Sequence, residues 1–156
     1  MSALIEVVSV INAAAATVFD LELDIDVHAE SLAKSRETAT TTTGRRQLGL
    51  GDEVTFGARH FGRRWNMTSR ITAYNRPYHF VDEQTRGPFR ALRHEHYFED
   101  LGDIRTRMID RMTIRAPLGP LGAVATRMLL APHLRRLLVE RAAHIKRLAE
   151  TADHGR

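Results

Sequence analysis

The chain has 156 residues, 43% of them hydrophobic and 27% charged, with a formal net charge of +4. These values are ordinary for one globular domain that is long enough to bury a proper core. The absence of cysteine excludes disulfides, thiolate metal sites and cysteine nucleophiles. The 23 basic residues are interleaved with 19 acidic ones rather than gathered in one run, so we expect no nucleic-acid partner.

The sequence also lacks recognisable targeting and membrane segments. No stretch approaches the roughly 20 apolar residues of a membrane span. The first residues, MSALIEVVSV, contain neither the basic region nor the cleavage site of a signal peptide. We therefore expect a cytoplasmic protein without stable membrane insertion, either a monomer or a homodimer.

The first third of the chain predicts a strand, two short helices and a further strand. Residues 4–11 are rich in Val and Ile, which is typical of a strand. The segments AAAATVFDLELD and DVHAESLAKS contain helix-forming residues, and both are too short to be stable without packing on a sheet. Residues 36–44 include a β-branched run with few apolar side chains and predict an edge strand.

Five more strands follow, because apolar and polar residues alternate in residues 53–60, 65–73, 78–84, 90–98 and 104–114. Gly62-Arg63, Asn75-Arg76-Pro77 and Gly87-Pro88 supply turns between them. In the last hairpin, a three-residue loop at Leu101-Gly102-Asp103 keeps the apolar sets of both strands on one face.

The inward face of this last hairpin carries unexpected polar residues. In the alternating pattern, His94, His96 and Asp110 point inward among Leu, Phe and Met. The three-residue loop would place His94 opposite Asp110, and His96 opposite Met108. A buried polar group without a partner costs about 1–3 kcal/mol. We therefore expect either such a pairing or water in a cavity.

The same pairing rule extends to the earlier strands. It would place His60 opposite Trp65 and Ser69 near Asp82. It also predicts the remaining neighbours of the two inward histidines, with Phe80 near His94 and Tyr78 near His96.

The C-terminal region changes to a helical period. Apolar residues recur from Leu121 through Val124 and Met128 to Leu148, and predict one long helix over residues 121–149. Pro132 should kink this helix, because proline removes a backbone hydrogen bond. Residues 1–150 then form a single domain, and residues 151–156 form a frayed tail.

This order of elements predicts an α+β fold, in which a curved seven-stranded antiparallel sheet wraps around a long C-terminal helix. The chain here resembles the superfamily of START, Bet v 1 and polyketide cyclase/dehydratase-like domains (SRPBCC, the helix-grip fold), and within it bacterial ligand-binding proteins. The segments that carry the resemblance are NAAAATVFDL, GDEVTFGARHFG, RPYHFVDEQTRGPFRALRHEHYFED, DRMTIRAPLGPLGAVA and LLVERAAHIKRL. The resemblance implies a cavity between the sheet and the terminal helix that binds a hydrophobic or amphipathic small molecule.

We predict the ligand-binding residues from the inward positions of the strands and from the apolar stripe of the helix. They are Phe56, His60, Trp65, Met67, Ser69, Tyr78, Phe80, Asp82, Gln84, Arg90, Leu92, His96, Phe98, Met108, Met112, Val124 and Met128. Two alternatives remain open beside simple binding.

The first alternative is a polyketide cyclase/dehydratase-like acid–base enzyme, in which Asp110 orients His94 and His94 moves a proton. Such chemistry needs no cofactor, and we predict none. The second alternative is a metal site. His94-x-His96 has a metal-ligand spacing, His60 could add a nitrogen, and Asp110 or Asp82 could add a carboxylate. The sequence does not fix the remaining ligands, so we predict histidines satisfied by Asp110, Tyr78 or water, and no metal.

Overall fold

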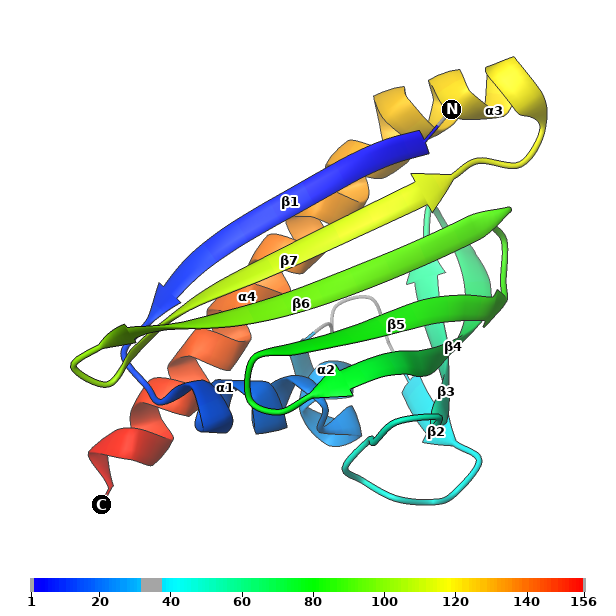
Figure 1. The fold of residues 1–156 in the computed structure, drawn as a ribbon. Helices are drawn as coiled ribbons and strands as arrows, with labels where there is room; N and C mark the ends of the chain where they lie inside the picture. The colour runs from blue at the N-terminus through cyan, green and yellow to red at the C-terminus, as the bar shows by residue number, and fades with distance from the viewer. Residues whose placement is uncertain (1, 32–37, 156) are drawn as a thin grey trace.

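The computed structural model describes residues 2–31 and 38–155, and its strands form one antiparallel sheet. The strands are β1 (Ser2–Ile11), β2 (Thr38–Thr41), β3 (Glu53–His60), β4 (Arg63–Asn75), β5 (His79–Arg86), β6 (Ala91–Gly102) and β7 (Arg105–Arg115). Their order in the sheet is β1-β7-β6-β5-β4-β3-β2, so the first strand pairs with the last. Figure 1 shows the sheet curving strongly, with β3 and β4 turned away from the direction of β6 and β7.

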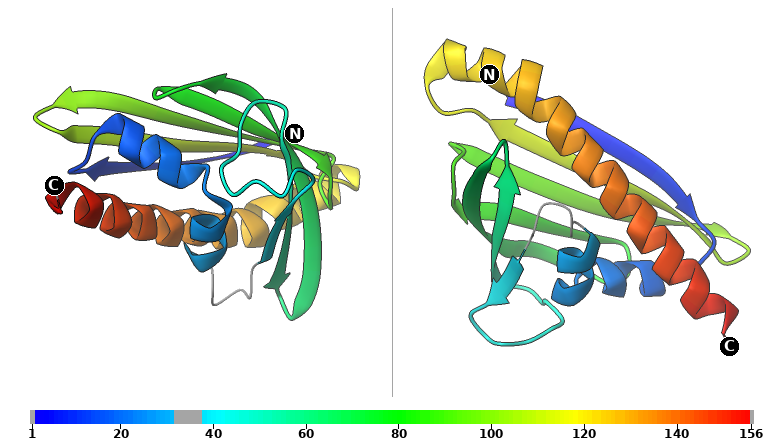
Figure 2. Two further views of the ribbon diagram at one scale, coloured as in Figure 1. Left: turned by 90° about the horizontal axis from the view of Figure 1, so that it is seen from below. Right: turned by 180° about the vertical axis from the view of Figure 1, so that it is seen from behind.

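Helices cover one face of this sheet. The helices α1 (Ala15–Glu22) and α2 (Ile25–Ser31) follow β1. The long terminal helix comprises α3 (Gly119–Ala125), a π-helical turn (Thr126–Leu130) and α4 (Ala131–His154). It runs diagonally along the concave face, with α1 and α2 beside its second half (Figure 2). These elements confirm the predicted curved sheet, long C-terminal helix and two short helices after the first strand.

The core forms where α1 meets the sheet. Phe19 is completely buried, and its ring makes edge contacts with Phe80 at 5.4 Å and with Phe98 at 5.3 Å between ring centroids. These two phenylalanines occupy inward positions of β5 and β6, as the alternation predicts. In the described part of the chain, no helix is long and apolar enough to cross a membrane.

The predicted pairing of β6 with β7 is wrong by two residues. His96 lies opposite Asp110, His94 opposite Met112, and Phe98 opposite Met108. The turn has two residues rather than three, because Asp103 and Ile104 both adopt positive φ, as the tight turn that matches strand twist requires. An irregularity in the pairing between Asp100 and Gly102 compensates for the shorter turn, so the apolar side chains of both strands stay on the same face. A shift of two residues leaves every side chain on its predicted face.

The other predicted cross-strand neighbours shift in the same way. The β3–β4 turn is Phe61-Gly62, so His60 lies opposite Arg63, and Ala58 lies opposite Trp65. In the next two strand pairs, Ser69 faces Gln84, Asp82 faces His94, and Phe80 faces His96. Tyr78 precedes β5 and is 56% exposed, so it does not contact the core as predicted. The predicted edge strand ends at Thr41 instead of Gly44. Its residues 36 and 37, like residues 32–35 after α2, lie outside the described residues.

The terminal helix differs from its prediction at both ends. It continues to His154, so residues 151–154 are helical rather than frayed. The carboxylates of Glu150 and Asp153 explain this extension, since they accept hydrogen bonds from the backbone N–H groups of Asn12 and Ala14 at 3.0 and 2.9 Å.

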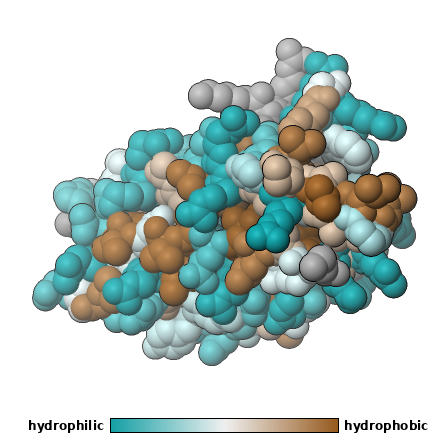
Figure 3. Space-filling model, turned by 90° about the horizontal axis from the view of Figure 1, so that it is seen from above, coloured by the Kyte–Doolittle hydropathy of each residue, from teal (hydrophilic) through white to brown (hydrophobic). Residues whose placement is uncertain are grey.

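At the other end, the predicted apolar stripe faces solvent. Val124 is 61% and Met128 69% exposed. A π-helical turn carries an extra residue, which rotates the phase of the helix just before Pro132. Figure 3 shows apolar side chains gathered at this end of the molecule.

Candidate functional site: an apolar cavity with a buried charged end

A cavity of about 490 Å³ lies between the concave face of the sheet, α2 and the terminal helix. Its walls are mainly apolar, with Glu22, Asp82, His94 and Arg141 gathered near α1 and two further imidazoles, those of His28 and His60, in other parts of the wall. Nine predicted residues line it: Phe56, His60, Trp65, Met67, Phe80, Asp82, Leu92, His94 and Met112. The terminal helix adds Leu134, Leu137 and Leu138, which the prediction did not include.

The other predicted ligand-binding residues lie elsewhere. Ser69, His96, Phe98 and Met108 are buried behind the wall; Tyr78, Arg90, Val124 and Met128 are exposed; and Gln84 binds the backbone of Phe89. The alternating pattern places a side chain on the concave face, but it does not tell whether that face meets the cavity or α1 at that point. Tyr78 and Arg90 are exposed because they lie just before strands β5 and β6 begin. Val124 and Met128 are exposed because the first part of the terminal helix is rotated.

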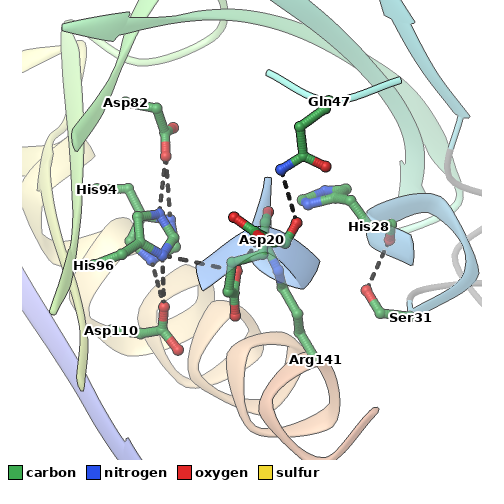
Figure 4. Close-up of polar contacts among 10 residues, drawn as sticks. Asp20, His28, Ser31, Gln47, Asp82, His94, His96, Asp110 and Arg141 are labelled. Atoms are coloured by element: carbon green, nitrogen blue, oxygen red, sulfur yellow. Dashed lines mark hydrogen bonds and ion pairs between the residues drawn. The ribbon is translucent and has the colours of Figure 1, made fainter. Parts of the chain in front are cut away.

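Three adjacent strands bring four ionisable side chains together on the concave face. His94 and His96 come from β6, Asp82 from β5 and Asp110 from β7. His96 Nε2 lies 3.0 Å from Asp82 Oδ2, and His96 Nδ1 lies 2.9 Å from Asp110 Oδ1. His94 Nε2 lies 3.3 Å from the same Asp110 oxygen. In Figure 4, Asp82 and Asp110 lie on opposite sides of the two imidazoles.

A buried ion pair, which the sequence analysis did not identify, adjoins this cluster. Glu22 of α1 and Arg141 of α4 meet at 2.6 Å, and the Glu22 side chain is completely buried. Glu22 Oε2 also lies 3.8 Å from His96 Nδ1, and both Glu22 and Arg141 line the cavity. Charged side chains are rarely buried without such pairing.

The surroundings of each histidine set its charge. Burial lowers the pKa of His96, but the adjoining carboxylates of Asp110 and Asp82 outweigh it and raise the pKa to about 9. Burial and the neighbouring His96 together lower the pKa of His94, although Asp110 and Asp82 oppose them. His96 is therefore an imidazolium at neutral pH, and His94 is neutral.

The buried carboxylates also differ in the direction in which their surroundings shift their pKa values. Burial alone would raise the pKa values of Asp82 and Asp110, but the adjoining histidines outweigh burial, and both pKa values fall. For Glu22, burial is the larger effect and raises the pKa, although Arg141 opposes it.

Some of these side chains are close enough to share one cation. Asp82, His94 and His96 can each offer one donor atom, all within 4.8 Å of one another, and so can Glu22, His96 and Asp110. His60, the possible third nitrogen ligand of the metal alternative, belongs to neither group. Its Nδ1 lies 2.9 Å from His133 Nε2 at the cavity mouth.

This histidine pair connects the β3–β4 hairpin to the start of α4. His133 also contacts the ring of Phe61, at 4.7 Å between centroids, and its Nδ1 lies 3.0 Å from Arg136. His60, Phe61 and the exposed Leu118 all line the cavity on this side. Contacts between the β3–β4 hairpin and the start of α4, which are far apart in the sequence, therefore border the cavity mouth on this side.

No family model matches the sequence, and no curated protein is similar to it by sequence. Solved structures are similar in fold. The Zhui aromatase/cyclase from a Streptomyces species has a TM-score of 0.78 at 18% identity, covering 96% of this chain and 94% of its own. Norcoclaurine synthase from Thalictrum, in complex with a transition state analogue, has a TM-score of 0.76 at 11% identity, covering 100% of this chain and 98% of its own.

A third similar structure is the major latex-like protein 151 from Panax ginseng. Its TM-score is 0.68 at 10% identity, and the match covers 95% of this chain and 97% of its own. At such identities the likeness concerns the fold. The chain thus has the helix-grip fold of these structures, as its sequence predicted.

Proposed function

We propose that the protein binds a small molecule with an apolar body and a polar group in the cavity between the sheet and the terminal helix. The cavity itself supports this function best. Its volume of about 490 Å³ lies within the range of about 300–1,000 Å³ that is typical of small-molecule sites. A solidly packed domain of this size would contain only small voids.

The distribution of polarity in the cavity indicates the kind of ligand. Apolar side chains from β3, β4 and the terminal helix form most of the wall, so the body of the ligand should be hydrophobic. Asp82, His94 and Arg141 reach the wall at one end. They can bind a hydroxyl, carbonyl or carboxyl group of the ligand and fix its orientation.

A cavity-filling substitution tests the proposal. Ala58 is buried on β3 and lines the cavity, so the side chain of an Ala58→Phe variant would occupy the ligand's space. Ala143→Phe, on the exposed face of α4, is the matched control. The probe is 8-anilinonaphthalene-1-sulfonate, followed by fluorescence titration, and native mass spectrometry detects co-purifying molecules. The proposal predicts saturable binding that Ala58→Phe abolishes and Ala143→Phe retains. Equal binding by both folded variants would contradict it.

One observation favours a second function, which is acid–base catalysis on the bound molecule. His94 lines the cavity, and Asp110 lies 3.3 Å from its Nε2 without lining the cavity. Asp110 can therefore hold a proton on Nε2 and leave Nδ1 to accept one from a ligand. A cyclisation or dehydration of an aldol-type intermediate would need only this group and correct positioning.

Turnover and affinity must be measured separately to test this second function. With a synthetic poly-β-ketone as substrate, His94→Ala and Asp110→Asn should lower the rate of product formation by about 10²–10⁴-fold for loss of a general base. The dissociation constant of the substrate should change much less. Unchanged turnover in His94→Ala would rule out this mechanism and leave the binding function intact.

A further inference from the structure

We propose that Asp82, His94 and His96 form a binding site for a divalent first-row transition-metal ion in the cavity wall, and that Asp110 orients both imidazoles. This site is independent of the binding function proposed above. Two imidazoles and one carboxylate are a donor set that suits Zn²⁺ and Fe²⁺.

The donor atoms converge from two neighbouring strands. Asp82 Oδ2 lies 3.0 Å from His96 Nε2 and 3.9 Å from His94 Nδ1. Bonds of about 2.0–2.2 Å to one ion place two of its ligand atoms about 3.0–3.5 Å apart. The first distance already lies in this range. The second exceeds it by less than about 1 Å, which a small rotation of the Asp82 side chain would correct.

The far nitrogens of both rings lie close to one carboxylate oxygen, although neither makes a hydrogen bond to it in this structure. Asp110 Oδ1 lies 3.3 Å from His94 Nε2 and 2.9 Å from His96 Nδ1. With these nitrogens protonated, neutral His94 keeps a lone pair on Nδ1, and a metal ion would displace the second proton of His96 from Nε2; these are the two atoms that face Asp82. Metal-binding histidines usually donate their second N–H to such a carboxylate, which fixes the tautomer and the ring orientation.

Packing holds this arrangement in place. The ring of His96 stacks on Phe80, with centroids 4.0 Å apart and planes 15° apart. His94 and His96 are 3% and 0% exposed, and their rings lie 3.8 Å apart. Because neither ring can turn away without disturbing the core, the donor atoms are preorganised for one ion.

The charges around the site favour a divalent ion. Asp82 and Asp110 flank the two imidazoles, whereas Glu22 is already paired with Arg141. A proton on His96 compensates only one of the two flanking carboxylates. An ion of charge +2 compensates both, which matters because unbalanced charge is costly in a buried site.

The site is also open on one side. Asp82 and His94 line the cavity, so the remaining coordination positions of the ion would face a bound molecule or water. A metal ion at His94 Nδ1 would prevent that atom from acting as a base. Metal binding and the acid–base mechanism above therefore exclude each other, whereas ligand binding is compatible with both.

The experiment titrates Zn²⁺ and Co²⁺ into the full-length protein after EDTA treatment and removal of the chelator. Calorimetry measures the stoichiometry and affinity, and visible absorption reports the environment of Co²⁺. We expect one ion per chain and Co²⁺ bands that differ from those of the aqueous ion. His94→Ala and Asp82→Asn should abolish saturable binding, and Asp110→Asn should weaken it by about 10–100-fold, as for other outer carboxylates.

His133→Gln and Asp20→Asn are matched controls, because each removes the same kind of group outside the cluster. Both should bind Co²⁺ like the unsubstituted protein. The proposal is overturned by a cobalt spectrum of the aqueous ion, or by equal binding in His94→Ala and the controls. If the cluster variants do not fold, Cu²⁺ electron paramagnetic resonance of the unsubstituted protein decides the question, since two coupled nitrogens support the site and none contradicts it.

Discussion

At the scale of single residues, the most consequential contact is the ion pair between Glu22 and Arg141. It joins α1 to α4 across 119 positions of the sequence, and Arg141 also donates to the backbone carbonyl of Glu22 at 3.2 Å. Because both groups are buried, each depends on the other for charge compensation. The pair therefore fixes α4 against α1 beside the cavity.

Glu22→Gln should destabilise the protein by about 3–5 kcal/mol, because it removes the charge of the carboxylate that lies 2.6 Å from the buried Arg141. The double variant Glu22→Gln/Arg141→Met should recover much of this loss, since it removes both charges. Urea unfolding followed by circular dichroism measures both changes. Asp20→Asn, which breaks the exposed pair with Arg76, is the control and should cost no more than about 1 kcal/mol. Equal losses for Glu22→Gln and Asp20→Asn would contradict the buried-pair argument.

The sequence contained a signal for this pair. Glu22 is four positions after Val18, and Arg141 is three positions after Leu138, so each charge falls in the buried phase of its helix. Helical spacing could thus have identified two inward charges. It could not have paired them, because spacing within one helix says nothing about a partner far away in the chain.

At the scale of elements, the β3–β4 hairpin and the start of α4 meet through His60 and His133 at the mouth of the cavity. Burial, His60 and Arg136 all lower the pKa of His133, and only Glu140 opposes them. The contact with His60 therefore favours neutral His133. As the pH falls below 6.5, the ordinary pKa of histidine, a His133 released from this contact takes up a proton before one that keeps it. The contact between the hairpin and α4 then weakens.

Bound 8-anilinonaphthalene-1-sulfonate should consequently dissociate severalfold faster at pH 5.5 than at pH 7.5, as measured by stopped-flow fluorescence. In His133→Gln, which cannot titrate in this range, the ratio of the two rates should fall close to one. A dissociation rate that falls on acidification would reverse the expected sign. The same pH dependence in the unsubstituted protein and the variant would exclude His133 as its source.

The elements themselves were largely predictable, whereas their registers were not. Alternation correctly placed His94, His96 and Asp110 on the inner face, because the period of a strand is two residues. The same period is unchanged when a strand shifts by two, so Asp110 was placed opposite His94 instead of opposite His96, although its carboxylate lies close to both. In the terminal helix, the π-helical turn at Thr126–Leu130 ended the regular period that the prediction of Met128 assumed.

At the scale of the whole molecule, the cavity reduces the packing between the sheet and the terminal helix. Burying apolar ligand surface against its walls should therefore stabilise the folded state as a whole. The stabilisation follows from mass action, because a ligand that binds only the folded chain shifts the unfolding equilibrium.

Saturation with a hydrophobic ligand at about 100 times its dissociation constant should add about 2.7 kcal/mol to the free energy of unfolding. For a domain of this size that corresponds to a rise in Tm of roughly 5–10 °C. Differential scanning fluorimetry with decanoate, whose dissociation constant is measured beforehand, checks the prediction. Ala58→Phe should show no rise, and Ala143→Phe should show the full one. A rise of equal size in Ala58→Phe would indicate binding outside the cavity.

The pairing of β1 with β7 has a consequence for biosynthesis. The ribosome delivers Ser2–Ile11 first, yet the neighbour of this strand in the sheet, Arg105–Arg115, emerges only after five other strands. The helix that covers the concave face follows later still. A nascent chain that ends at Arg115 therefore exposes an apolar trough, which makes it vulnerable to aggregation. Slow translation of the codons for residues 116–154 should therefore increase the binding of chaperones to the nascent chain.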